Sequence, residues 1–295
     1  QSEAFRKMYI RQTKNDSKDS YVIAQIMRFG EFSTTSLSDE NIMAIRQLSR
    51  YRISLVDECS DWKRKVISLL DQVFPEYSSI FSDTFGVTSK EVLLKYPTPE
   101  DMMSVSAKKL SSLLNKASRG RFNINKANQL KNTASRSFGI KFAKNAFSFQ
   151  IKQMISQIIF IENQLDELEK EISSLLYKTN QVITSIIGIG DVLGAIIIGE
   201  IGDISRFESA SKLVAFAGLD VKVNQSGQFS GSQMKISKRG SPYLRRAIWT
   251  AANRAAFVDP VLSNYYQSLR ARGKHHLTAV GGVARKLCNI IFAVL

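Results

Sequence analysis

One apolar repeat limits the possible folds of this chain more than any other feature. Nine apolar residues between positions 147 and 175 are spaced alternately four and three residues apart. This spacing places them along one side of a helix, as in the seam of a coiled coil. They are Phe147, Ile151, Met154, Ile158, Ile161, Leu165, Leu168, Ile172 and Leu175. Because so long an apolar stripe must be covered, we expect antiparallel pairing with a second helix of the same chain, in an arrangement that also supports a dimer.

A long helix over residues 39–72 is the expected partner, with Asp39 as N-cap and a stop at Phe74-Pro75. After a loop with two prolines, Thr98 and Asp101 form a typical capping start for a short helix. Residues 101–143 then predict short basic helices broken at Gly120 and Gly139. The chain is therefore expected to be mostly α-helical.

The formal net charge of +15 is concentrated in two blocks. Residues 1–100 have no net charge and residues 144–180 have a net charge of −1, whereas residues 101–143 and 181–295 each carry +8. Two concentrated basic blocks favour two phosphate-facing surfaces, because cations that neutralise phosphates release counterions. A membrane surface or an acidic protein is the alternative partner.

The composition excludes several classes of protein. Two distant cysteines, Cys59 and Cys288, form neither a disulfide scaffold nor a four-ligand zinc site, and there are only two histidines. No signal peptide is evident, and no apolar run is expected to reach the roughly 18 residues of a membrane span. We therefore expect a cytoplasmic protein of two or three domains, without a membrane partner.

An apolar turn with two glycines lies at residues 186–195. Gly188 and Gly190 alternate with isoleucines and precede a helix of small residues. This pattern is typical of a helix-hairpin-helix, in which backbone N–H groups of the turn can bind a phosphate. The alternative is a turn that only connects packed helices.

Two further groups of residues could support chemistry. Asp16 and Asp19 are three residues apart, so a helix places both carboxylates on one face, where they could bind Mg²⁺ or could simply be a solvated face. Residues 221–258 contain seven cations and no acid, and include Ser226 and Ser237 in glycine-containing turns. Such a segment suits phosphoryl transfer through a serine, or a phosphate clamp without chemistry.

Together these blocks resemble the insertion-sequence-110 family of transposases. The resemblance over residues 180–295 rests on five blocks in order, which are Ile186–Gly190, Phe216–Asp220, Ser226-Gly227, Ile236–Gly240 with Leu244-Arg245, and Ala284–Leu287. Upstream, Lys14–Asp19 with Ala24 resembles the last two acidic positions of that family's DEDD motif, in its RuvC-like domain of the RNase H fold.

The resemblance implies a DNA recombinase of a mobile element in a prokaryotic, nucleoid-associated setting. It implies Mg²⁺ bound partly by Asp16 and Asp19, and Ser226 as nucleophile, with Ser237 as the second choice. It also implies a structured guide RNA that pairs with donor and target DNA, and dimers that assemble into a tetramer. The alternatives are a non-catalytic helix-hairpin-helix scaffold and a RuvC-like metal-dependent nuclease.

The expected organisation is the C-terminal part of a RuvC-like α/β domain over residues 1–38, a helical coiled-coil region over 39–180 with a basic insert at 101–143, and a helical transposase domain with a helix-hairpin-helix over 181–295. The first Asp and the Glu of the motif are expected to precede Gln1, in a longer protein. The expected nucleic-acid contacts are Gly188, Gly190, Lys235, Lys238, Arg239, Arg245, Arg246, Lys108, Lys109, Arg119 and Arg121.

Overall fold

The computed structural model describes residues 16–29, 39–179, 181–221, 225–226, 229–230 and 235–295. These residues are mostly helical, and their only strands are a pair of two residues each, so the mostly-α prediction is confirmed. The chain divides into two compact units, residues 1–39 and residues 40–295, which are described separately. In the first unit, helix α2 (Asp16–Phe29) begins at the first of the two predicted acidic residues.

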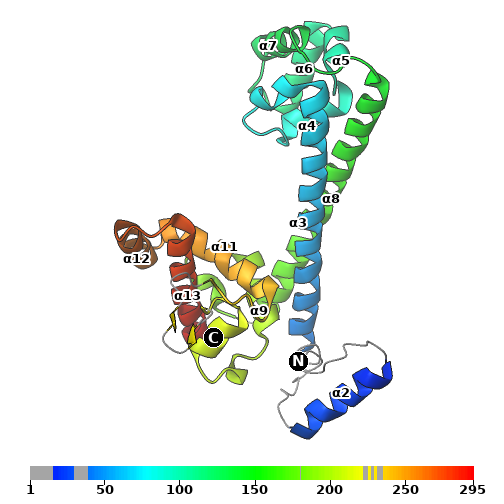
Figure 1. The fold of residues 1–295 in the computed structure, drawn as a ribbon. Helices are drawn as coiled ribbons and strands as arrows, with labels where there is room; N and C mark the ends of the chain where they lie inside the picture. Colours follow the sequence, from blue (N-terminus) through cyan, green and yellow to red (C-terminus); the bar gives the residue numbers. More distant parts are fainter. Residues whose placement is uncertain (1–15, 30–38, 180, 222–224, 227–228, 231–234) are drawn as a thin grey trace. The chain divides into compact units, whose positions relative to one another are not determined.

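Two long helices organise the second unit, and they lie side by side in Figure 1. They are α3 (Glu40–Val73) and α8 (Lys144–Lys178). Ile53 of α3 shares a core with Ile172 of α8, whereas Val66 shares a second core with Ile155. Since the order of the residues is opposite in the two helices, the pair is antiparallel. The heptad seam therefore packs within the chain, as predicted.

The residues between these helices form a small helical subdomain, residues 75–143, which we call the cap. It contains η1 (Pro75–Ser79), α4 (Val87–Lys95), α5 (Pro99–Ser104), α6 (Ala107–Ala117) and α7 (Ile124–Ser135). Thr98 caps α5 by accepting the Asp101 N–H at 3.2 Å, as its sequence position indicated. Leu110, Leu114 and Leu130 are buried in the core that the cap shares with α3 and α8.

The C-terminal helices pack around a core rich in alanine and isoleucine. After η2 (Ile183–Ser185) come α9 (Asp191–Ile201), η3 (Ile204–Arg206) and α10 (Ala210–Phe216). The hairpin strands β1 (Gln225–Ser226) and β2 (Phe229–Ser230) are followed by α11 (Pro242–Val258), α12 (Pro260–Ala271) and α13 (His276–Val294). Five buried alanines of α11, at positions 247, 251, 252, 255 and 256, allow close contact with α9 and α13.

Helix α13 is long and apolar enough by composition to span a membrane, which the sequence prediction did not anticipate. Its residues from Ala279 to Ala284 are buried, as are Leu287, Cys288 and Ile291. It contacts α10, α11 and α12, which makes it the central core helix of this region. Burial raises the pKa of Cys288 to about 12, and both cysteines are buried and free.

Candidate functional site

Two stretches of backbone, residues 216–221 and residues 236–241, are joined by hydrogen bonds and form what we call the base. The second stretch belongs to the acid-free segment 221–258. Three hydrogen bonds connect them, from Ser237 N to Asp220 O, from Lys238 N to Gly218 O and from Ser241 N to Phe216 O, at 2.8, 3.1 and 2.9 Å. Gly218 and Gly240 have φ of 66° and 78°. An added Cβ would lie 2.1 and 1.9 Å from carbonyl oxygens across the base. Both positions therefore require glycine.

The two candidate serines occupy different places. Ser226 lies on β1, opposite Phe229 of β2, in the hairpin that the base carries. Ser237 lies in the base itself, where it is only 6% exposed. Its hydroxyl donates to the carboxylate of Asp220 and accepts the Arg239 N–H at 3.3 Å. Ser237 is therefore a buried residue of the base whose hydroxyl makes two hydrogen bonds. Ser226 instead belongs to the hairpin that lies between the two halves of the base in the sequence.

The predicted cations of this segment differ in whether their side chains already form hydrogen bonds within the protein. Lys235 and Lys238 are exposed. Arg239 is also exposed, but its guanidinium donates to Asp220 at 3.3 Å. Arg245 donates to the carbonyl of Ala217 at 3.2 Å. All four of these sequence-predicted residues lie in the base or within four residues of it along the chain, and their contact with nucleic acid remains a prediction.

Arg246 instead connects α11 to the helix pair. It forms an ion pair of 2.8 Å with Asp57 of α3. The hydrogen bond from Arg246 lowers the pKa of Asp57, and the same bond raises the pKa of Arg246. Sequence reasoning could not find this pair, because its members are 189 residues apart.

Sequence analysis also missed a buried carboxylate beside this base. Glu200 of α9 is 4% exposed and accepts two hydrogen bonds from Arg50 of α3, at 2.6 and 3.1 Å. It also accepts the hydroxyl of Ser241 at 2.7 Å, and Ser241 caps α11. This network joins α3, α9 and α11 and supports the residues that carry the base. The one signal in the sequence is a single acid within the apolar run of α9.

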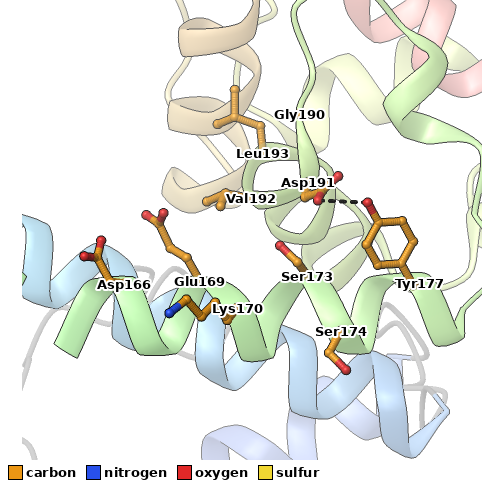
Figure 2. A pocket seen from close by; sticks show the side chains of 10 residues that line it. All are labelled: Asp166, Glu169, Lys170, Ser173, Ser174, Tyr177, Gly190, Asp191, Val192 and Leu193. Carbon is orange, nitrogen blue, oxygen red and sulfur yellow. Dashed lines mark hydrogen bonds between the residues drawn. The ribbon is translucent and has the colours of Figure 1, made fainter. Parts of the chain in front are cut away.

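The turn before α9, which contains Gly188 and Gly190, packs against α11 on one glycine and lies next to a pocket lined by acids. An added Cβ on Gly188 would lie 3.1 Å from the Ala251 carbonyl, so this residue allows α11 to approach, whereas Gly190 has open space around it. Figure 2 shows the open pocket of about 810 Å³ beside the turn. Its lining includes the carboxylates of Asp166, Glu169 and Asp191 but only one amine. This charge balance disfavours a phosphate there, and the helix-hairpin-helix assignment remains a prediction.

The four predicted cations of the cap lie on α6 and in the turn that follows it. Lys108 and Lys109 are exposed on α6, and Arg119 and Arg121 are exposed on either side of Gly120. Within the described residues, none of the four forms an ion pair. Their charges are therefore available to a phosphate-bearing partner.

The predicted metal ligands lie in the first unit. Asp16 and Asp19 both fall in α2, so the helical spacing assumed for them is present. The described part of the chain contains no group of three or more acidic, histidine or cysteine residues that could hold a metal ion. The described residues alone therefore do not complete a Mg²⁺ site.

Two family models match separate parts of the chain. Residues 180–267 match the model described as "Transposase IS116/IS110/IS902 family", which includes the base, the hairpin and α11. Residues 1–75 match a model described as "Transposase", that of the DEDD type in IS110 elements, which includes α2. The two matches cover the two parts of the chain in which the candidate serine and the candidate metal ligands lie.

Two of the relatives match over nearly the whole chain, and a third matches over about half of it. The IS110 uncharacterized 43.6 kDa protein of Streptomyces coelicolor is 25% identical over 98% of this chain and 72% of its own length. The IS116 uncharacterized 44.8 kDa protein of Streptomyces clavuligerus is 23% identical over 96% of this chain and 71% of its own. A pilin gene-inverting protein of Moraxella lacunata is 27% identical over 52% of this chain and 48% of its own. The chain therefore carries the transposase domains of the IS116/IS110/IS902 family and is a homologue of the IS110 insertion-element proteins.

Proposed function

We propose that this transposase cuts and rejoins DNA through a covalent serine–phosphate intermediate, with Ser226 as the nucleophile. The observation that supports this most is the position of Ser226 on a hairpin whose base is closed by backbone hydrogen bonds. The exposed cations Lys235, Lys238 and Arg239 lie in the same base or next to it, and the one acid of the base, Asp220, pairs with Arg239. Such cations stabilise the charge on phosphate oxygens during substitution at phosphorus.

The reaction is a balanced exchange of phosphoester bonds. The Ser226 oxygen forms a bond to phosphorus and loses its proton to a base, while the bond from phosphorus to one strand oxygen breaks and that oxygen takes up a proton. A hydroxyl of the new strand then attacks the serine ester and releases Ser226. Because each step makes one phosphoester bond and breaks another, no external energy source is needed.

Ser237 is the less suitable nucleophile. A serine that attacks a DNA phosphate must be reached by a bulky backbone, whereas Ser237 is buried. Its hydroxyl is already bonded to Asp220, and this pair connects the two sides of the base. We assign Ser237 a structural role, which the experiment below separates from catalysis.

The remaining components are also part of the proposal. Asp16 and Asp19 would contribute carboxylates to a Mg²⁺ site within a RuvC-like domain, and Mg²⁺ when bound would supply charge stabilisation at the phosphate. A guide RNA would select donor and target DNA by base pairing, while Lys108, Lys109, Arg119 and Arg121 would bind backbone phosphates. Homodimers would join into a tetramer, in a nucleoid-associated setting in the cytoplasm.

The test is a recombination assay with the full chain, its DNA ends and its RNA, and with a nicked substrate that traps a covalent adduct. We expect Ser226→Ala to abolish both recombination and the adduct, with unchanged DNA binding. Ser237→Ala is expected to lower stability but to retain an adduct that maps to Ser226. An adduct on Ser237, or recombination by Ser226→Ala at the wild-type rate, would contradict the assignment.

Two outcomes of the same assay identify the alternatives. Metal-dependent cleavage that persists in Ser226→Ala and is lost in Asp19→Ala would indicate a RuvC-like nuclease. Tight binding without any cleavage or adduct, under conditions in which related elements recombine, would indicate a non-catalytic scaffold.

A further inference from the structure

The most exposed aromatic side chains of the described residues lie in the segment that connects α7 to α8. Phe138 is 81% exposed and Phe142 is 73% exposed, and Phe149 in the second turn of α8 is 65% exposed. A phenylalanine ring in water forgoes the free energy that its burial would provide. Three such rings within twelve residues therefore suggest a surface that contacts something else.

The backbone of this segment is firmly attached to the end of α3. Glu76 accepts the Ser137 hydroxyl at 2.8 Å and the Phe138 N–H at 3.2 Å. The Ile140 N–H donates to the carbonyl of Gln72 at 2.8 Å. Gly139 lies so close to Val73 that an added Cβ would be 2.1 Å from the Val73 carbonyl oxygen. The exposure of Phe138 is therefore not a consequence of a loose loop.

Cations flank the exposed rings, and acids are absent from the surrounding sequence. Arg136, Lys141 and Lys144 are exposed, and no Asp or Glu occurs from residue 102 to residue 161. Within the described residues these three cations form no ion pair. Lys144 lies in the first turn of α8, where the helix dipole disfavours a positive charge, so helix stability does not explain it.

We propose that residues 136–149, which we call the basic–aromatic segment, bind single-stranded DNA. The rings of Phe138 and Phe142 would stack on unpaired bases, and Arg136, Lys141 and Lys144 would contact the phosphates. A duplex conceals the faces of its bases from such rings. The inference goes beyond the proposed serine chemistry and rests only on DNA being the substrate, since an exchanged strand must leave its own duplex.

A second copy of the chain is the competing occupant of this surface. In a symmetric contact of the segment with itself, Arg136, Lys141 and Lys144 would face the same cations of the other copy. No acid occurs in the segment itself, and the two carboxylates bonded to it, Glu76 and Asp101, are fewer than its three cations. A like-with-like contact therefore remains repulsive, whereas a nucleic-acid strand supplies a negative charge at each phosphate.

The test is fluorescence anisotropy of a labelled mixed-sequence DNA strand with the full chain, compared with the same sequence as a duplex and as RNA. We expect the double variant Phe138→Ala, Phe142→Ala to bind the single strand about thirtyfold more weakly or weaker still, because two stacking contacts are lost. Its affinity for the duplex should change little. Lys141→Gln with Lys144→Gln should make the slope of log affinity against log salt less steep by about 1.4.

Phe160→Ala is the matched control, because Phe160 is a 57% exposed phenylalanine of α8 close to the acid Glu162. It should bind DNA like the wild type, and the double variant Phe138→Trp, Phe142→Trp should retain the affinity. Equal losses in the Phe160 control, unchanged affinity of the double variant, or preference for the RNA strand would each overturn the proposal. So would dissociation of an oligomer by the double variant in light scattering. Since binding is the readout, failure of the serine chemistry would not affect this result.

Discussion

The cap and the C-terminal segment 221–258 are both strongly basic in sequence, but folding treats their charges differently. In the C-terminal segment, two arginines meet acids from elsewhere in the chain, Arg239 with Asp220 and Arg246 with Asp57. In the cap, Lys90 of α4 pairs with Glu162 of α8, but Lys126 and Lys131 donate to backbone carbonyls. Within the described residues, no cation of α6 or α7 forms an ion pair. The net charge of a sequence window therefore does not measure the charge that folding leaves for a partner. The helices α6 and α7 of the cap therefore keep more unpaired positive charge for a partner than the C-terminal segment does.

The two regions also differ in how closely a glycine is packed, and substitution of these glycines should have the largest effect on stability. Gly240 closes the base with φ of 78° and no room for a Cβ, whereas Gly120 of the cap has φ of 87° and open space. Gly240→Ala should lower the free energy of unfolding by about 2–5 kcal/mol, from left-handed strain plus overpacking. Gly120→Ala should lower it by about 1–2 kcal/mol, from left-handed strain alone.

Urea denaturation of both variants measures this difference in stability. A recombination assay of the same two variants tests whether the base also affects activity. Because the base carries the hairpin of Ser226, Gly240→Ala should also reduce recombination at a temperature at which the protein remains folded. Equal destabilisation by the two substitutions would mean that the close contact at the base does not determine its stability.

How much of this structure the sequence could predict depends on the range of the interactions. The heptad of α8, the Thr98 cap and the breaks at Gly120 were predictable because each depends on a few neighbouring residues. The pairing of Arg50 with Glu200 and the burial of Ser237 were not, since they arise only when α3, α9 and the base pack together. Tertiary packing changes the interpretation most at Arg239 and Arg246, which sequence reasoning assigned to nucleic acid and which the fold pairs with acids.

Neutralising cations in the two regions tests the difference in available charge directly. We expect glutamine at Lys108, Lys109, Arg119 and Arg121 to make the slope of log affinity for duplex DNA against log salt less steep by up to about 3.6, or about 0.9 for each lost phosphate contact. Glutamine at Arg239 and Arg246 should change the slope by less than about 1, because these charges are already shared with acids. Binding titrations at several salt concentrations supply both slopes, and equal changes per charge would contradict the comparison.

The smallest effect should come from the ion pair that connects the C-terminal segment to the helix pair. The side chains of Asp57 and Arg246 are 57% and 45% exposed, so solvent screens the pair and Asp57→Asn should lower the free energy of unfolding at neutral pH by less than about 1 kcal/mol. Because Arg246 lowers the pKa of Asp57 in the folded chain, this stabilisation is present above the unfolded pKa of about 4 and is lost as the pH falls through the lower folded value. Urea titrations should therefore show a wild-type advantage over Asp57→Asn at pH 7 that disappears in strong acid. An advantage that persists in strong acid would mean that Asp57 stabilises the contact through its shape rather than through its charge, and that Arg246 is as available to DNA as the cations of the cap.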